Sequence, residues 1–171
     1  IQDETRLHLQ NSYYFIENLK KIYDNKDFPI LLKSYIHTTK NNKNIDISCP
    51  LNPQFLITDI NEKEVIIKNS YLKPLIIPFI NNKNEVYKLM VKKDDLEKDL
   101  IIMNFIKLID NILKLEENLD LYITTYKILP ISKDLGLIEI ISNAETIYSI
   151  NKKYKFSIQN YILENNSHMS I

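Results

Sequence analysis

A lysine at the end of a strand-like segment, followed by acidic residues, is the group in this chain best suited to chemistry. In VYKLMVK (86–92), Lys92 has the opposite parity to Leu89 and Val91, which places it on the other face of a strand from those apolar side chains. Asp99 follows one turn inside a helix-like segment, at the edge of its apolar arc. A lysine and an aspartate placed beside an apolar sheet could hold a nucleotide phosphate. The alternative, which composition alone favours, is a solvated strand-to-helix connection with a capped helix start.

Other residue types with catalytic or metal-binding capacity form no recognisable site. Gly136 is the single glycine, which excludes the glycine-rich dinucleotide turn, the Walker A loop and the protein-kinase glycine loop. Cys49 is the single cysteine, so neither an internal disulfide nor a cysteine zinc site is possible, and a reducing compartment is expected. DLG (134–136) precedes an apolar strand and is interpreted as a turn, not as a kinase metal motif. The histidines lack metal-ligand spacing; they are His8, His37 and His168.

Length and charge exclude several broad classes of function. The 171 residues match one domain, and 22 Lys+Arg balance 22 Asp+Glu, so nothing in the net charge favours nucleic acid or an anionic surface. No uncharged apolar run approaches the ~18 residues of a membrane span. The first ten residues, IQDETRLHLQ, are too polar for a secretory signal and begin with Ile. We therefore expect a processed product or a segment of a longer protein.

The first third of the chain indicates helices and then a change to strands. Apolar spacing predicts one helix over 3–24 and a second over 28–40, which begins near Pro29. KNNKN (40–44) is interpreted as a solvated linker, so the predicted first domain is a helical segment over 1–45. Beyond it, FLITDI (55–60) and EVIIKN (64–69) flank NEK and predict a hairpin.

The middle of the chain predicts the rest of a sheet around one long helix. PLIIPF (74–79) is a third strand, with Pro78 at an edge or bulge, and 86–92 is a fourth. A helix is predicted over 94–118, with Asp94 as its N-cap, Glu97 completing a capping box, and a broad apolar arc. That arc contains Ile101, Phe105, Leu108, Ile109, Ile112 and Leu113. Two more strands (121–129, 136–141) and a final helix (157–165) complete an α+β fold: an antiparallel sheet of about five strands with one long buried helix.

Four segments in this order resemble the N-terminal lobe of the phosphoinositide 3-kinase and 4-kinase family. They are NSYLKPLIIPF (69–79), YKLMVKKDDLEKDL (87–100), ENLDLYITTYKIL (117–129) and GLIEIISNAETI (136–147). Within the family, ENLDL with TYKIL, and SIQNYI (157–162), are most similar to class III, the vacuolar-sorting phosphatidylinositol 3-kinases. The resemblance implies the N-lobe of a protein-kinase-like (lipid kinase) fold, with the N-lobe and hinge over 46–142 and the start of a C-lobe over 143–171.

The resemblance also implies roles for residues of an ATP site. Ser70 would lie in the loop above the phosphates, Lys92 would contact phosphate with Asp99 as its helix partner, and Tyr126 would line an inner pocket. The backbone at Glu139 and Ile141 would receive adenine, with Ile138 and Ile140 packed nearby. The sequence departs from the family pattern in the lysine loop, where Lys93 alone separates Lys92 from Asp94 and Asp95. It also has Glu97 for the family arginine and Thr125 for the proline before Tyr126.

The family's D-R-H-x-x-N catalytic loop and D-F-G metal motif are missing from this sequence, whose one arginine is Arg6. Because phosphoryl transfer needs these groups, we expect no catalytic or metal-binding residue here. We expect instead the ATP-binding lobe of a phosphatidylinositol 3-kinase that uses ATP and Mg²⁺, with the metal ligands in a C-lobe of the same parent chain. The expected partners are phosphatidylinositol in endosomal or vacuolar membranes, reached from the cytoplasm in trafficking or autophagy, and a regulatory subunit, but no nucleic acid. A phosphatidylinositol 4-kinase lobe and a non-catalytic pseudokinase module remain alternatives.

Overall fold

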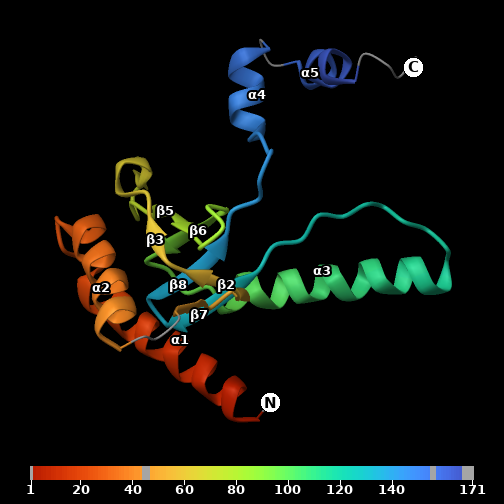
Figure 1. Ribbon diagram of the computed structural model, residues 1–171. Helices are drawn as coiled ribbons and strands as arrows, with labels where there is room; N and C mark the ends of the chain where they lie inside the picture. Colours follow the sequence, from red (N-terminus) through yellow and green to blue (C-terminus); the bar gives the residue numbers. More distant parts are fainter. Residues whose placement is uncertain (1, 44–46, 155–156, 167–171) are drawn as a thin grey trace. The chain divides into compact units, whose positions relative to one another are not determined.

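Figure 1 shows the computed structural model, which describes residues 2–43, 47–154 and 157–166. The chain divides into two compact units: the first ends at Ile140 and the second begins at Ile141. The domain divisions expected at residues 45 and 142 stay predictions, and His168 lies outside the described residues.

The first unit contains three helices, one 3₁₀ turn and eight strands among its described residues. In chain order they are α1 (Gln2–Ile22), α2 (Phe28–Lys43), β1 (Ile47–Cys49), β2 (Asn52–Ile57), β3 (Asp59–Ile60), η1 (Glu62–Glu64), β4 (Ile66–Ile67), β5 (Leu75–Ile80), β6 (Val86–Lys92), α3 (Glu97–Glu116), β7 (Ile128–Ser132) and β8 (Leu135–Glu139). The second unit contains α4 (Ile147–Lys153) and α5 (Ile158–Asn165). Thr146 and Ser157 cap these last two helices through their side-chain oxygens.

The main sheet is antiparallel, with strand order β3-β5-β6-β8-β7, and β4 pairs with β5 as well. This confirms the α+β fold with an antiparallel sheet of about five strands. Leu75 of β5 lies opposite Val91 of β6, and Lys92 lies opposite Gly136 of β8. The alternation of side chains along these registers assigns each residue to one of two faces.

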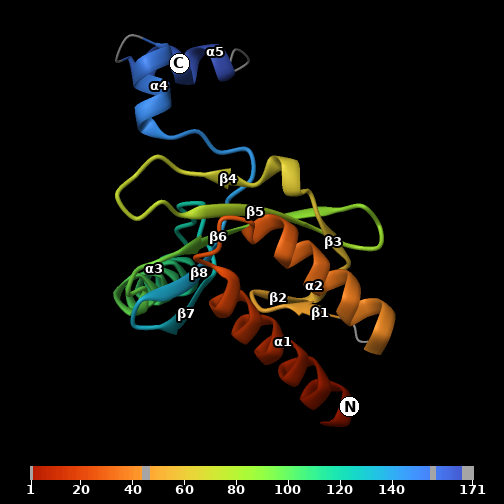
Figure 2. The ribbon, with the colours of Figure 1, turned by 90° about the vertical axis from the view of Figure 1, so that its left-hand side faces the viewer.

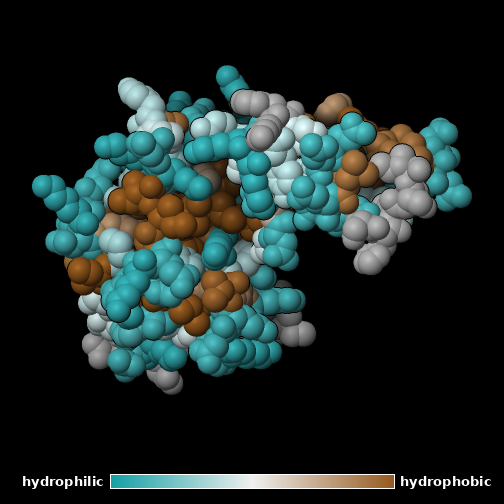
Figure 3. Space-filling view, turned by 90° about the horizontal axis from the view of Figure 1, so that it is seen from above, coloured by the Kyte–Doolittle hydropathy of each residue, from teal (hydrophilic) through white to brown (hydrophobic). Residues whose placement is uncertain are grey.

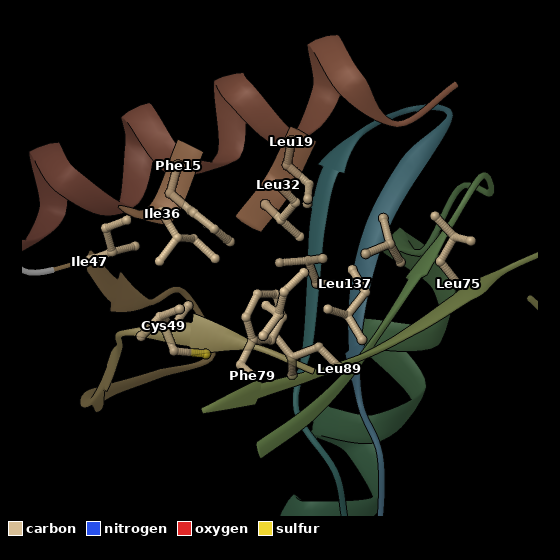
Figure 4. Packing of buried hydrophobic residues seen from close by; sticks show 14 of the residues in the cluster. Phe15, Leu19, Leu32, Ile36, Ile47, Cys49, Leu75, Phe79, Leu89 and Leu137 are labelled. Atoms are coloured by element: carbon tan, nitrogen blue, oxygen red, sulfur yellow. The ribbon is translucent and has the colours of Figure 1, made fainter. Parts of the chain in front are cut away.

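One face of the sheet is covered by α1 and α2, as Figures 1 and 2 show. Apolar residues recur every four positions, at Phe15 and Leu19 in α1, at Tyr23 directly after it, and at Phe28, Leu32 and Ile36 in α2. All six are buried, together with Leu89, Val91 and Leu137 from the strands below. Figure 4 shows Phe15, Leu19, Leu32 and Ile36 directed at Phe79, Leu89 and Leu137. The side chains between this face and the two helices form the main hydrophobic core.

Three local predictions differ from the structure around this core. The predicted hairpin over 55–69 is wrong, because β3 and β4 both pair with β5 and η1 interrupts them. The predicted linker 40–44 is helical as far as Lys43, and 44–46 lie outside the described residues. Pro78, predicted at an edge or bulge, lies in β5, an inner strand. On the side of β5 that pairs with β3 and β4, Pro78 lies opposite the η1 segment that separates these two strands. Its missing N–H therefore breaks no ladder hydrogen bond there.

Two further differences concern α3 and the strand before the hinge. The predicted capping box at Asp94 and Glu97 does not form: Leu96 is the N-cap residue and makes no side-chain cap bond. The N–H of Glu97 instead donates to Asp95. The predicted strand over 121–129 starts only at Ile128, and residues 118–127 form an irregular segment that returns to the sheet (Figure 1).

Among the described residues, every residue with a positive φ is a residue other than glycine. The five positions are Lys73, Asn84, Asn118, Tyr122 and Asn143. Gly136 has an ordinary φ, but a Cβ added there would lie 2.3 Å from Cδ1 of the buried Leu96. The single glycine is therefore required for space and not for backbone conformation.

Candidate nucleotide-binding site

Lys92, the predicted phosphate lysine, ends β6 on the sheet face opposite the α1 and α2 core. Its Nζ lies 2.5 Å from Oδ2 of Asp94, with 28% of its side chain exposed. This bond to Lys92 holds the pKa of Asp94 below its usual value, so the ion pair persists at neutral pH. The prediction paired Lys92 with Asp99, but the structure pairs it with Asp94, because the short turn folds that carboxylate back onto the strand end.

Lys93 lies on the other side of the same turn. Its Nζ is 2.6 Å from Oδ1 of Asp24, in the connection between α1 and α2, and 5.6 Å from the centre of the Tyr23 ring. The ion pair with Asp24 raises the pKa of Lys93. This ion pair ties the turn to the α1 and α2 side. Of the two lysines, Lys92 alone shares a face with Met90.

Ser70 lies in the connection between β4 and β5, at the same end of the sheet as Lys92. The register fixes this placement, because Ile67 pairs with Leu75 and Leu75 pairs with Val91, the residue before Lys92. Ser70 is exposed and opens a tight turn in which its carbonyl accepts the N–H of Lys73. Lys73 adopts a φ of 41°, so this turn reverses the chain without glycine.

An apolar row crosses the sheet on the Lys92 face. Met90 of β6 lies between Ile76 of β5 and Ile138 of β8, and Ile138 lies beside Ile128 of β7. Ile128 packs with Leu96 and Met103 in a second hydrophobic cluster, with Ile138, Leu100 and Tyr126 against it. The structure thus brings Tyr126 and Ile138, two predicted site residues, to one cluster. Apolar side chains of this kind line ligand sites and can pack against an aromatic base.

Most of the predicted apolar arc of helix α3 does not pack against the sheet. Its buried side chains are Met103 and Asp110, whereas Ile101 is 67% exposed and Phe105 is 62% exposed. The expectation of a buried helix therefore fails for this arc within the described residues, since nothing in them covers it. Asp99 is exposed on the first turn of α3, four residues before Met103. Figure 3 shows that apolar side chains also reach the surface of one face of the molecule.

The predicted hinge residues fall partly in each unit. In the first unit, the N–H of Ile140 donates to the main-chain carbonyl of Lys88, and the N–H of Glu139 donates to the main-chain carbonyl of Lys127. The Glu139 carboxylate accepts the O–H of Tyr87 at 2.6 Å and the N–H of Lys127 at 2.9 Å. Ile141 begins the second unit and is exposed. Sequence reasoning missed the carboxylate and its partner Tyr87, because their contact depends on the β6–β8 register, which no local pattern reveals.

One cavity of the first unit has none of the predicted ATP residues in its wall. It has a volume of about 530 Å³ and lies between the α1–α2 connection and the 71–75 segment, where Tyr23, Val65 and Ile67 are among the residues that line it. Lys92 and Ile138 lie instead on an open sheet face, which becomes a cleft only when a second wall faces it. No group of three or more His, Cys, Asp or Glu side chains suited to a metal ion occurs in the described parts of the chain. No described helix is long and apolar enough to cross a membrane.

Residues 86–170, about half of the chain, match the family model described as "Phosphatidylinositol 3- and 4-kinase". This match begins at β6 and continues through the predicted lysine and hinge segments. The chain belongs to the phosphatidylinositol 3- and 4-kinase family. The antiparallel sheet with α3 is consistent with the N-terminal lobe of that fold, as the sequence resemblance implies.

Individual members of the family show the same relationship. Phosphatidylinositol 3-kinase VPS34 of Saccharomyces cerevisiae is 41% identical over 109 residues, which cover 63% of this chain and 12% of the yeast protein. The nodule isoform of phosphatidylinositol 3-kinase from Glycine max is 41% identical over 96 residues, or 56% of this chain and 12% of the plant protein. The human phosphatidylinositol 3-kinase C2 domain-containing subunit gamma is 34% identical over 109 residues, or 60% of this chain and 7% of the human protein. The chain therefore spans a small part of its relatives' length.

Proposed function

We propose that this chain is the ATP-binding lobe of a phosphatidylinositol 3-kinase of the class III type. Joined to a C-lobe, it would phosphorylate the inositol 3-hydroxyl of phosphatidylinositol. The observation that carries the proposal is the placement of Lys92: it shares a sheet face with Met90 and an apolar row, at the sheet end where the Ser70 loop turns. The similarity to proteins named phosphatidylinositol 3-kinases supports the substrate class.

Each residue has a physical role in this proposal. Lys92 exchanges Asp94 for a phosphate oxygen, which an ammonium group can do because both acceptors are anionic oxygens. Asp99, on the first turn of α3, orients that ammonium, while Ser70 and neighbouring N–H groups cover the phosphates. Ile138, Ile140 and Tyr126 pack around the base, and the backbone at Glu139 and Ile141 binds it. These groups position ATP; they transfer no proton.

Magnesium would neutralise phosphate charge in such a kinase. The described residues provide no cluster of metal ligands, so the ligands and the group that receives the hydroxyl proton belong to the expected C-lobe. The same proposal includes phosphatidylinositol in an endosomal or vacuolar membrane as substrate and a regulatory subunit as partner. We therefore expect the isolated chain to show no ATP turnover on phosphatidylinositol vesicles above a no-protein control.

One observation favours a second candidate, a non-catalytic nucleotide-binding module. The turn after β6 is shorter than the family pattern, and its Asp94 already neutralises Lys92. If that pair never opens, the lobe can serve as a scaffold that does not transfer phosphate.

Substitution of the two adjacent lysines tests the proposed function in the full-length protein. We expect Lys92→Met to lower kcat/KM for ATP by at least ~100-fold, as when one preorganised charge is removed from a phosphoryl-transfer site. Lys93→Met is the matched control and should leave activity within about two-fold of wild type, because its ion pair is on the other side of the turn. Sensitivity at Lys93 alone would place the phosphate one residue further on. Insensitivity at both positions in an active enzyme would overturn the assignment of the site.

A further inference from the structure

The β7–β8 ladder changes its hydrogen bonding at Glu139. Ile128 lies opposite Ile138 and Leu129 opposite Leu137, so the same register continued by one residue places Lys127 opposite Glu139. The N–H of Glu139 donates to the Lys127 carbonyl at 2.9 Å. In a regular antiparallel pair of this kind, the two residues exchange both of their N–H···O bonds. The second bond would join the N–H of Lys127 to the Glu139 carbonyl.

A side chain takes the place of that second bond. The N–H of Lys127 donates to Oε2 of Glu139 at 2.9 Å. The other carboxylate oxygen, Oε1, accepts the O–H of Tyr87 at 2.6 Å, and the Tyr87 ring packs against Phe55 with 5.5 Å between centres. The carboxylate is therefore fixed from β6 and from the residue that precedes β7. Its capture of the Lys127 N–H leaves the Glu139 main-chain carbonyl without the donor that the ladder would have supplied.

The carboxylate itself lies away from the predicted nucleotide face. Glu139 has the same parity along β8 as Leu137, and Tyr87 the same parity along β6 as Leu89, so both side chains belong to the α1 and α2 face. Met90 and Ile138 belong to the opposite face. Burial and the bond to Glu139 raise the pKa of Tyr87, so its hydroxyl stays a donor at neutral pH. Any effect of this pair on a bound base must pass through the backbone.

We propose that the Glu139 carboxylate is a positioning residue that keeps the Glu139 carbonyl open as an acceptor for the exocyclic amine of a 6-aminopurine. This inference rests on the proposed function, since it assumes that the base binds at this segment. A carbonyl accepts hydrogen bonds and cannot donate them. It therefore favours adenine, which presents an amine at C6, over a purine with hydrogen or an oxo group there.

Nucleotide binding to the full-length protein tests this role. The probes are ATP and purine riboside triphosphate, which lacks the 6-amino group, each measured by competition with a fluorescent ATP analogue. We expect the wild type to prefer ATP by about five-fold or more, the range of one hydrogen bond. In Glu139→Ala the N–H of Lys127 is free to bond the carbonyl. The preference should then fall below about two-fold, chiefly through weaker ATP binding.

Two variants separate this role from a general loss of structure. Glu139→Gln keeps an oxygen for the Lys127 N–H and should retain most of the preference for ATP. Glu116→Ala makes the matched deletion at an exposed position of α3 and should leave it unaltered. If Glu139→Ala fails to fold, the pair Tyr87→Phe and Glu139→Met removes both polar partners with little change of shape, and it should also lose the preference.

The outcomes distinguish the inference from the function beneath it. A folded Glu139→Ala variant, or a folded Tyr87→Phe and Glu139→Met variant, that keeps the wild-type preference for ATP overturns the positioning role. So does an equal loss of affinity for both nucleotides, because a merely structural effect would not depend on the amine. A wild-type protein that binds neither nucleotide overturns the proposed function and this inference together.

Discussion

The two faces of the main sheet differ in how completely they are covered. On one face, α1 and α2 bury Phe15, Leu19, Leu32 and Ile36 against the strands. On the other, α3 contributes Met103 to a small cluster and leaves Ile101 and Phe105 largely exposed. Lys92 and Ile138, two predicted ATP side chains placed by strand register, lie on this second face.

This contrast separates a stabilising surface from a binding surface. Apolar burial on the α1 and α2 face supplies the main driving force for folding. The α3 face keeps an apolar row and a lysine accessible, which a ligand-binding site requires. We therefore expect substitutions on the α3 face to cost less stability than substitutions on the α1 and α2 face.

The largest expected effect comes from truncating the covered face. Phe15→Ala should destabilise the purified chain by about 3–5 kcal/mol, because Phe15 is fully buried and contacts Phe79. The matched change Phe105→Ala, at a side chain that is 62% exposed, should cost less than about 1 kcal/mol. Urea denaturation of both variants measures the difference. Similar losses at the two positions would show that both faces are equally covered.

A second effect concerns the close contact between Gly136 and Leu96 on the α3 face. We expect Gly136→Ala to destabilise the chain by about 1–3 kcal/mol, because its Cβ would meet the side chain of Leu96 and the Leu129 carbonyl. Leu96→Ala in the same chain should recover part of the loss caused by Gly136→Ala, by making room. Thermal unfolding of the two single variants and the double variant measures this coupling. Purely additive effects would contradict the contact.

A smaller effect is expected where the predicted site meets the hinge. Ile140→Ala in the full-length protein should raise KM for ATP by about two- to five-fold through lost packing, with a smaller effect on kcat. Steady-state kinetics at varied ATP concentration separate the two constants. A fall in kcat at unchanged KM would mean that this segment does not hold the base.

The smallest effect belongs to the ion pair that joins the turn to α1 and α2. Asp24→Asn removes the partner of Lys93, and both side chains are largely solvent-exposed. The melting temperature should fall slightly at low ionic strength, and the difference from wild type should vanish in high salt. ATP binding should be unchanged, since the pair lies on the covered side. A change in ATP affinity would show that the two faces are linked through Lys93.

Sequence patterns predicted those parts of the fold whose signal is local. Alternation along 86–92 identified the face that Lys92 shares with Met90. Helical apolar spacing predicted α1, and the start near Pro29 predicted α2. The prediction of a hairpin over 55–69 was wrong, because β3 and β4 have only two residues each and both pair with β5. Their pairing is set by partners distant in sequence, which no local pattern shows.

The candidate site was predictable only as far as family motifs and strand parity reach. The motifs identified Lys92, Tyr126 and the hinge, and their assignment as ligand contacts stays a prediction. The amphipathic pattern of α3 could not say what covers its apolar arc, since periodicity reports a face and not its partner. The choice of Asp94 over Asp99 as the ion-pair partner depends on a turn shorter than the family's, whose geometry no motif specifies.

The five positive-φ positions have a consequence for how this chain tolerates substitution. Asparagine serves at three of them, 84, 118 and 143, and it accepts left-handed backbone better than most residues. We expect a saturation survey to accept glycine at these turns, where the removal of Cβ relieves strain. The same survey should reject every larger residue at position 136, where the limit is volume. In this protein, the place where glycine is indispensable is a packed strand, and the turns are where it could be gained.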